Sequence, residues 1–131
     1  MLWTKNLETG IPTIDEQHKE LFRQIDALLA VSGANKEKQV TEALNFLDRY
    51  IVKHFTDEQN MHLQSKYPKA VAHRTYHDNY VTTFRQLKEK YIKEGPTVAN
   101  NMAVNKSVVG WLKEHILIHD KEFAEFYKKK P

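Results

Sequence analysis

Cysteine is absent from the sequence. Disulfide bonds, thiolate metal sites and cysteine nucleophiles are therefore excluded. No apolar run approaches the roughly 18 residues that a membrane-spanning helix needs, so we expect no transmembrane segment. The first residues also lack the basic region followed by an apolar one that opens a secretory signal. These absences leave a cytoplasmic location as the expectation.

A large excess of one charge sign is absent as well. The 131 residues include 20 Lys and Arg against 17 Asp and Glu, which gives a net charge of +3. Lys128, Lys129 and Lys130 account for the whole excess. Lysines near the end of a helix also complement its negative pole. We therefore expect no nucleic-acid partner.

The length suits a single domain over residues 1–131, long enough for one sizeable core. Nothing in the sequence reads as a strand or a repeat. An extended arm over residues 1–12 precedes a first helix, which Thr13 and Glu16 should open as a capping box. Gly33 should end that helix.

Three more helices are predicted by signals of the same kind. Asn35 can cap the second, Pro68 suits the first turn of the third, and the Gly95–Pro96 pair stops it. The fourth begins between residues 98 and 104 and continues to about residue 127. Long helices joined by short connections pack antiparallel to their neighbours. The expected fold is all-α, an antiparallel up-down-up-down four-helix bundle with an extended N-terminal arm.

Polar residues occupy helix positions where the spacing calls for apolar ones. In each predicted helix, residues three and four apart form one inward-facing stripe. The four stripes are Ile14, His18, Leu21, Ile25, Leu28; then Val40, Leu44, Leu47, Ile51, His54, Glu58, Met61; then His73, His77, Tyr80, Phe84, Leu87, Tyr91; and Val104, Val108, Trp111, His115, Ile118. Burying several unpaired imidazoles and a carboxylate would be strongly unfavourable. A metal centre is the arrangement that makes such a core stable.

Five histidines and two carboxylates are the candidate metal ligands. They are His18, His54, His73, His77, His115, Glu58 and Asp120. Seven nitrogen and oxygen ligands exceed what one tetrahedral zinc ion needs. They suit two octahedral first-row ions bridged by carboxylates. Imidazole combined with carboxylate favours iron over manganese, zinc or copper.

The order and spacing of these residues resemble the hemerythrins, in their single-domain bacterial form. The resemblance covers nearly the whole chain. It rests on the arm from Trp3 to Gly10-Ile11, Ile14-Asp15-Glu16-Gln17-His18, His54-Phe55-Thr56-Asp57-Glu58, Tyr67-Pro68, His73-x-x-x-His77 and Trp111-Leu112-x-x-His115-Ile116-x-x-x-Asp120. The resemblance implies a four-helix bundle in which two non-haem iron ions (Fe2+/Fe3+), joined by an oxo or hydroxo bridge, bind dioxygen reversibly.

The resemblance also implies how the ligands divide between the two irons. One iron would be filled by the three histidines His73, His77 and His115. The other would have two histidines, His18 and His54, and one position open for dioxygen. Both irons would share two bridging carboxylates, Glu58 and Asp120. An apolar wall excluding water and reductants from the oxygen pocket would comprise Phe55, Trp111, Leu112 and Ile116, although plain core packing explains each of these singly.

Three polar residues need separate predictions. Gln59 follows Glu58 where many relatives carry a second acidic residue, and we expect it to leave the ligand set unchanged. His62, one turn beyond Glu58, could contact the ligand set from outside or lie on the surface, and we expect it on the surface. Helix periodicity favours His119 as a ligand, because it lies about 40° from His115 whereas Asp120 lies about 140° away. The family pattern and the need for a second anionic bridge favour Asp120. We therefore predict a π-type turn between His115 and Asp120. This turn would bring Asp120 into line with His115 and leave His119 pointing away from the irons.

Two other functions compete with that of an oxygen carrier. A di-iron oxidase or peroxidase-like enzyme of the ferritin-like type would use Glu-x-x-His motifs on two helices, and the sequence contains none. Oxygen or redox sensing would need a separate partner chain. We predict an oxygen carrier, storage or delivery protein that is not an enzyme. The sequence identifies no protein acceptor of the oxygen.

Overall fold

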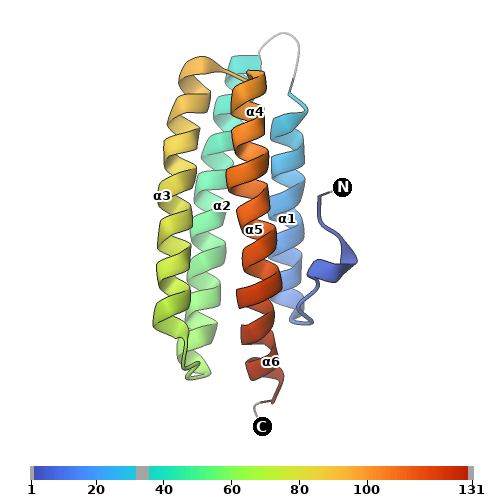
Figure 1. Ribbon diagram of the computed structural model, residues 1–131, viewed down its shortest axis with the longest axis vertical. Coiled ribbons are helices and arrows are strands. Elements are labelled where there is room, and N and C mark those ends of the chain that lie inside the picture. The colour runs from blue at the N-terminus through green and yellow to red at the C-terminus, as the bar shows by residue number, and fades with distance from the viewer. Residues whose placement is uncertain (1, 32–35, 130–131) are drawn as a thin grey trace.

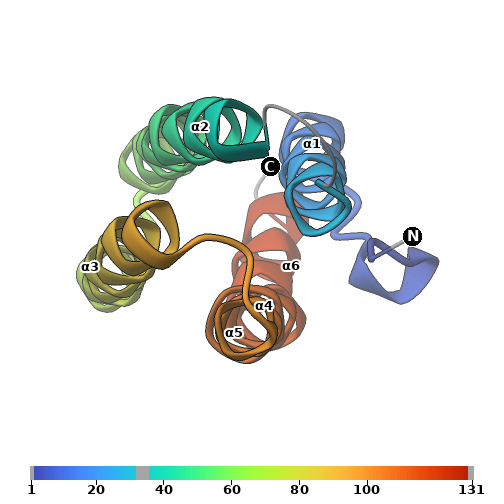
Figure 2. The same ribbon diagram turned by 90° about the horizontal axis from the view of Figure 1, so that it is seen from above.

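The computed structural model describes residues 2–31 and 36–129, and within these ranges it contains helices and no strand (Figure 1). The first three rods are α1 (Pro12–Leu29), α2 (Lys36–Gln64) and α3 (Ala70–Glu94). The fourth is continuous but composite, made of α4 (Val98–Val104), η2 (Asn105–Gly110), α5 (Trp111–His115), η3 (Ile116–Asp120) and α6 (Lys121–Lys129). The rods stand in chain order around a common axis and alternate in direction (Figure 2). The predicted antiparallel four-helix bundle is confirmed.

The first helix begins differently from the prediction. The capping box of Thr13 and Glu16 is wrong, because α1 begins at Pro12 and no side chain caps it. Proline has no N–H group, so one of the donors that a cap would satisfy is missing. Asp15 instead accepts a hydrogen bond from the backbone N–H of Thr9 at 2.8 Å. This carboxylate ties the N-terminal arm, which contains one short 3-10 turn, η1 (Lys5–Leu7), to α1.

Glycine and threonine set the ends of the later helices. Gly95 ends α3 with a φ of 85°, in a region that glycine adopts readily. Thr97 then caps α4 by accepting a hydrogen bond from the backbone N–H of Asn100 at 3.1 Å. The predicted signals at Gly33 and Asn35 lie outside the described residues.

In the first three rods, the predicted inward stripes are the residues that are buried inside the bundle. Every stripe residue in α1 is buried, and the exceptions in α2 and α3 are Met61 and Leu87, which are half-buried. The fourth stripe is wrong towards its end, since Trp111 is half-buried and Ile118 is 53% exposed. The stretches η2 and η3 are π-helical, with more residues in each turn than an α-helix has. Trp111, which follows η2, and Ile118, which lies within η3, are therefore rotated away from the face that a regular α-helix would give them.

Apolar residues fill the bundle on both sides of a polar level. A large cluster includes Leu21 and Phe84, and a smaller one includes Ile14 and Phe123. His18 lies between Ile14 and Leu21 on α1, so the polar level separates the two clusters. Of the helices described, none combines the length and the apolar character that crossing a membrane requires.

Candidate metal centre

The structure brings all seven predicted ligands together at the polar level of the bundle. Two groups of side chains place their donor atoms within 4.8 Å of one another: Glu58, His73, His77, His115 and Asp120 form the first, and His18, His54 and Glu58 form the second. Each of the seven residues is at most 3% exposed. Glu58 belongs to both groups. The cluster therefore has the layout of two adjacent metal positions.

Each carboxylate directs one oxygen to each group. Glu58 Oε1 lies 2.9 Å from His73 Nε2, whereas Oε2 lies 3.4 Å from His54 Nε2. Asp120 Oδ1 lies 3.2 Å from His115 Nε2, whereas Oδ2 lies 3.1 Å from His18 Nε2. This is the arrangement that two bridging carboxylates require.

The spacing of the donor atoms suits metal coordination. With metal–ligand bonds of about 2.1 Å, adjacent ligands of an octahedron stand about 3 Å apart. His73 Nε2 lies 2.9 Å from Glu58 Oε1, from Asp120 Oδ1 and from His115 Nε2. Several donors thus surround common points at octahedral separations.

Many of these atoms have no hydrogen-bond partner among the described residues. The buried atoms concerned include both carboxylate oxygens of Glu58 and of Asp120, and the Nε2 atoms of His18, His54 and His77. In an ordinary core, each unsatisfied buried polar group costs about 1–3 kcal/mol. Two cations would satisfy all of them, so the residues present fit a di-iron group.

The protonation of two candidate histidines and of one carboxylate also suits metal binding. Burial lowers the pKa of His54 to about 4 and that of His77 to about 2, which keeps both imidazoles neutral at pH 7. Burial and the charge of Asp120 raise the pKa of Glu58, but the imidazoles of His62 and His73, whose Nε2 atoms lie 3.5 Å and 2.9 Å from Oε1, outweigh them and hold the pKa below its ordinary value. Neutral imidazoles and ionised carboxylates are the forms that bind metal ions.

The π-helical turn explains how one helix supplies two ligands five residues apart. The stretch η3 (Ile116–Asp120) is π-helical, as predicted, and its wider turn directs Asp120 to the same side as His115. His119 belongs to neither donor group, and its half-buried ring packs against Tyr76 with centroids 4.2 Å apart. The orientations predicted for Asp120 and His119 agree with this placement. The second π-helical stretch, η2, was not predicted.

The family can now be assigned. The Hemerythrin HHE cation binding domain family matches residues 9–127. The chain belongs to the hemerythrin family. As a hemerythrin, it binds dioxygen at a non-haem di-iron centre.

Individual relatives match over most of their length. The bacteriohemerythrin of Methylococcus capsulatus is 28% identical, covering 95% of this chain and 94% of the relative. The bacteriohemerythrin of Clostridium acetobutylicum is 26% identical, covering 95% and 98%. The myohemerythrin of Theromyzon tessulatum is 29% identical, covering 79% and 81%. The crystal structure of wild-type hemerythrin superimposes with a TM-score of 0.81 at 27% identity, covering 97% of both chains.

Two glutamines in this hemerythrin contact the outer nitrogens of candidate ligands. Gln17 Oε1 lies 2.6 Å from His54 Nδ1, and Gln59 Nε2 lies 3.2 Å from His77 Nδ1. An imidazole that coordinates a metal through Nε2 carries its proton on Nδ1 and needs an acceptor there. Gln17 supplies that acceptor directly through Oε1. Gln59 supplies it when its amide is turned over, which brings Oε1 to the place of Nε2. The sequence pattern did not indicate this role, since Gln17 and His54 belong to different helices.

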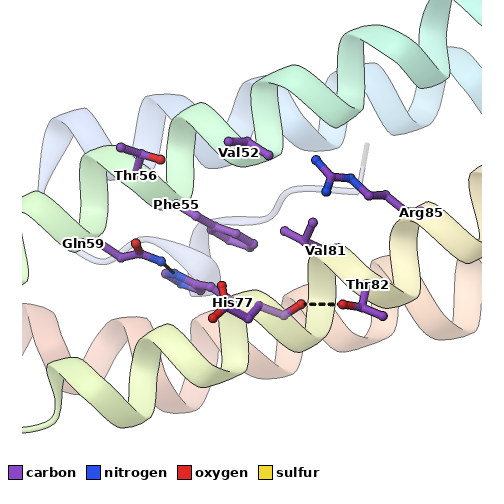
Figure 3. Close-up of a pocket in the computed structure, with 9 residues that line it drawn as sticks. Val52, Phe55, Thr56, Gln59, His77, Val81, Thr82 and Arg85 are labelled. Carbon is purple, nitrogen blue, oxygen red and sulfur yellow. Dashed lines mark hydrogen bonds between the residues drawn. The ribbon is translucent and has the colours of Figure 1, made fainter.

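The predicted oxygen-pocket residues lie close to the ligands. Phe55 stacks on His77 with centroids 3.8 Å apart, and Trp111 stacks on His115 with centroids 4.6 Å apart. The other two, Leu112 and Ile116, are buried in the large apolar cluster. A surface pocket of about 420 Å³ between α2 and α3 is lined by Phe55, Gln59 and His77 among others (Figure 3). The pocket brings the protein surface close to the candidate site.

The prediction that His62 lies on the surface is wrong. The residue is only 1% exposed, and its Nε2 lies 3.5 Å from Glu58 Oε1. At this end of α2 the buried face passes through His62, and the predicted stripe residue Met61 is only half-buried. The four-residue spacing from Glu58 was a signal that could have placed His62 inside.

Proposed function

We propose that this hemerythrin is a reversible oxygen carrier, used for storage or delivery, whose two irons are held by the seven clustered side chains. The observation that carries the proposal is the placement of two carboxylates, Glu58 and Asp120. Each has one oxygen near the histidines of one iron position and its other oxygen near those of the other position. Residues 1–131 would form one hemerythrin domain. The cytoplasmic location stays a prediction.

The unequal histidine count supports an open position on one iron. With both carboxylates bridging, one iron would have His73, His77 and His115, and the other would have only His18 and His54. An oxo or hydroxo bridge would complete six ligands on the first iron and leave the second with five. First-row ions with these ligands favour six. The vacancy would accept dioxygen.

The iron pair, when bound, supplies the electrons that reversible dioxygen binding uses. The protein's own part is to hold the ligands and exclude water. Gln17 would fix the tautomer and orientation of His54 through its contact at Nδ1. Phe55 and Trp111, stacked on ligand rings, would shield the site from water and from outside reductants.

The buried site favours a carrier over an enzyme. All seven side chains are at most 3% exposed, and even His77, which lines the surface pocket, is 1% exposed, so the ligands offer an organic substrate almost no accessible surface. The similar proteins are named bacteriohemerythrin and myohemerythrin. Turnover with a substrate would require an opening large enough to admit it.

Cycles of air and argon test this proposal. The protein is reconstituted with ferrous iron without oxygen, and its optical spectrum is recorded on adding air and again after argon. We expect argon to restore the ferrous spectrum over repeated cycles, with slow oxidation as the only loss. Rapid, continuous consumption of oxygen in the presence of a reductant would instead indicate an oxidase.

A further inference from the structure

His62 is the buried imidazole that the seven-ligand cluster leaves unused. It lies on α2, four residues after Glu58, and is 1% exposed. Neither of its ring nitrogens has a hydrogen-bond partner among the described residues. A buried polar group without a partner is destabilising. A histidine at this position therefore calls for an explanation beyond packing.

The surroundings of His62 are apolar on one side and charged on the other. Its ring packs edge-on against Phe123, with centroids 4.2 Å apart, and lies 5.2 Å from the ring of Tyr67. Leucine would fill such a space equally well, so packing does not require an imidazole. On the other side, Nε2 lies 3.5 Å from Glu58 Oε1. That side also holds the ring of His73, with centroids 4.5 Å apart, and the charged atom near Nε2 is the carboxylate oxygen of Glu58.

His62 lies beyond the donor cluster, not within it. It belongs to neither group of donor atoms that lie within 4.8 Å of one another. Glu58 Oε1 faces His73 Nε2 at 2.9 Å and is therefore used on the side of the three histidines. A carboxylate oxygen has two lone pairs, so it can bind a metal ion and also accept a hydrogen bond. His62 is placed to donate that second interaction.

We propose that His62 is a positioning residue, which donates a hydrogen bond from Nε2–H to Oε1 of Glu58 in the iron-loaded protein. The inference rests on the proposed function, because it assigns Glu58 as a bridge. The hydrogen bond fixes the orientation of the carboxylate and withdraws electron density from it. A weaker anionic donor stabilises ferric iron less, so His62 favours the ferrous pair.

The midpoint potential of the iron pair tests this role, with zinc uptake as a second readout that needs no redox chemistry. His62→Leu removes the donor at similar volume, and His62→Gln keeps an N–H donor. His119→Leu is the matched control, because His119 is another histidine near the site that belongs to neither donor group, and its half-buried ring packs against Tyr76 instead of facing Glu58. We expect His62→Leu to shift the oxidation equilibrium about tenfold towards ferric iron, or 59 mV for one electron. His62→Gln should keep a midpoint potential close to that of the wild type, because the N–H donor is retained. His119→Leu should have the wild-type potential.

Zinc should still bind at two ions per chain in all three variants, because the seven ligands are unchanged. A His62→Leu variant with the wild-type potential and only a lower melting temperature would overturn the proposal and leave His62 a packing residue. Loss of one zinc ion in that variant would also overturn it, because His62 would then be a ligand. A wild-type protein that takes up no metal pair would overturn the proposed function and this inference with it.

Discussion

Replacing Asp120 with alanine should prevent stable assembly of the di-iron centre. Asp120 is 1% exposed, and its two oxygens lie on opposite sides of the cluster. Oδ1 is 2.9 Å from His73 Nε2, and Oδ2 is 3.1 Å from His18 Nε2. One substitution therefore removes an anionic ligand from both proposed iron positions.

The size of the effect follows from the burial of the charges. Removing one partner from a buried ion pair costs about 3–5 kcal/mol of free energy, because the remaining charge is left uncompensated. Each 1.4 kcal/mol corresponds to a factor of about ten in affinity, so we expect metal affinity to fall by about two to four orders of magnitude. Alanine also leaves the facing imidazoles of His18 and His115 without their carboxylate.

Competition with a chelator measures this loss, and elemental analysis gives the iron bound per chain. His119→Ala is the control, since His119 is adjacent in sequence but its ring packs against Tyr76. We expect iron content to collapse in Asp120→Ala and to stay unchanged in His119→Ala. The opposite result would refute the assignment of Asp120 and the argument from the π-helical turn.

Two further predictions concern outer contacts. Gln17→Leu should weaken metal binding about 10–100-fold by removing the acceptor at His54 Nδ1, and a chelator titration at the wild-type level would contradict this. Partial burial raises the pKa of Asp48, but hydrogen bonds from Arg85 and Lys88 outweigh it and hold the pKa below its ordinary value of 3.8. Because the folded pKa is the lower one, the stabilisation is present above pH 3.8 and is lost as the pH falls through the folded value. Asp48→Asn should therefore lower the free energy of unfolding by about 0.5 kcal/mol at pH 7, a small value because solvent screens the exposed Arg85, and urea titrations should show the difference disappearing in acid.

The sequence pattern was sufficient to predict the bundle and the residues that meet at its polar level. His18, His54 and His77 interrupt regular apolar stripes, so their burial follows from helix periodicity alone. Periodicity alone favoured His119, whereas the family pattern and the need for a second anionic bridge favoured Asp120. The π-helical turn could then be predicted, because a regular α-helix cannot direct His115 and Asp120 to one point.

The remaining features depend on packing between helices, which periodicity does not encode. Ile118 is exposed because the π-helical stretch before it, η2, and the one that contains it, η3, rotate the end of the fourth rod. The burial of His62 is the exception, because its four-residue spacing from Glu58 indicated it, and the rings of Tyr67 and Phe123 pack against it there. The contact between Gln17 and His54 joins two helices, and no spacing rule within one helix relates them.

The most direct test of the account measures iron and dioxygen on the same sample. Protein reconstituted with ferrous iron under argon is analysed for iron per chain, then exposed to air while dioxygen uptake is measured, and then returned to argon. We expect two irons per chain, one for each donor group. We also expect about one dioxygen to bind to each iron pair and to be released again under argon. A plateau at one iron per chain, or an uptake that argon does not reverse, would contradict the claim of a reversible di-iron oxygen site.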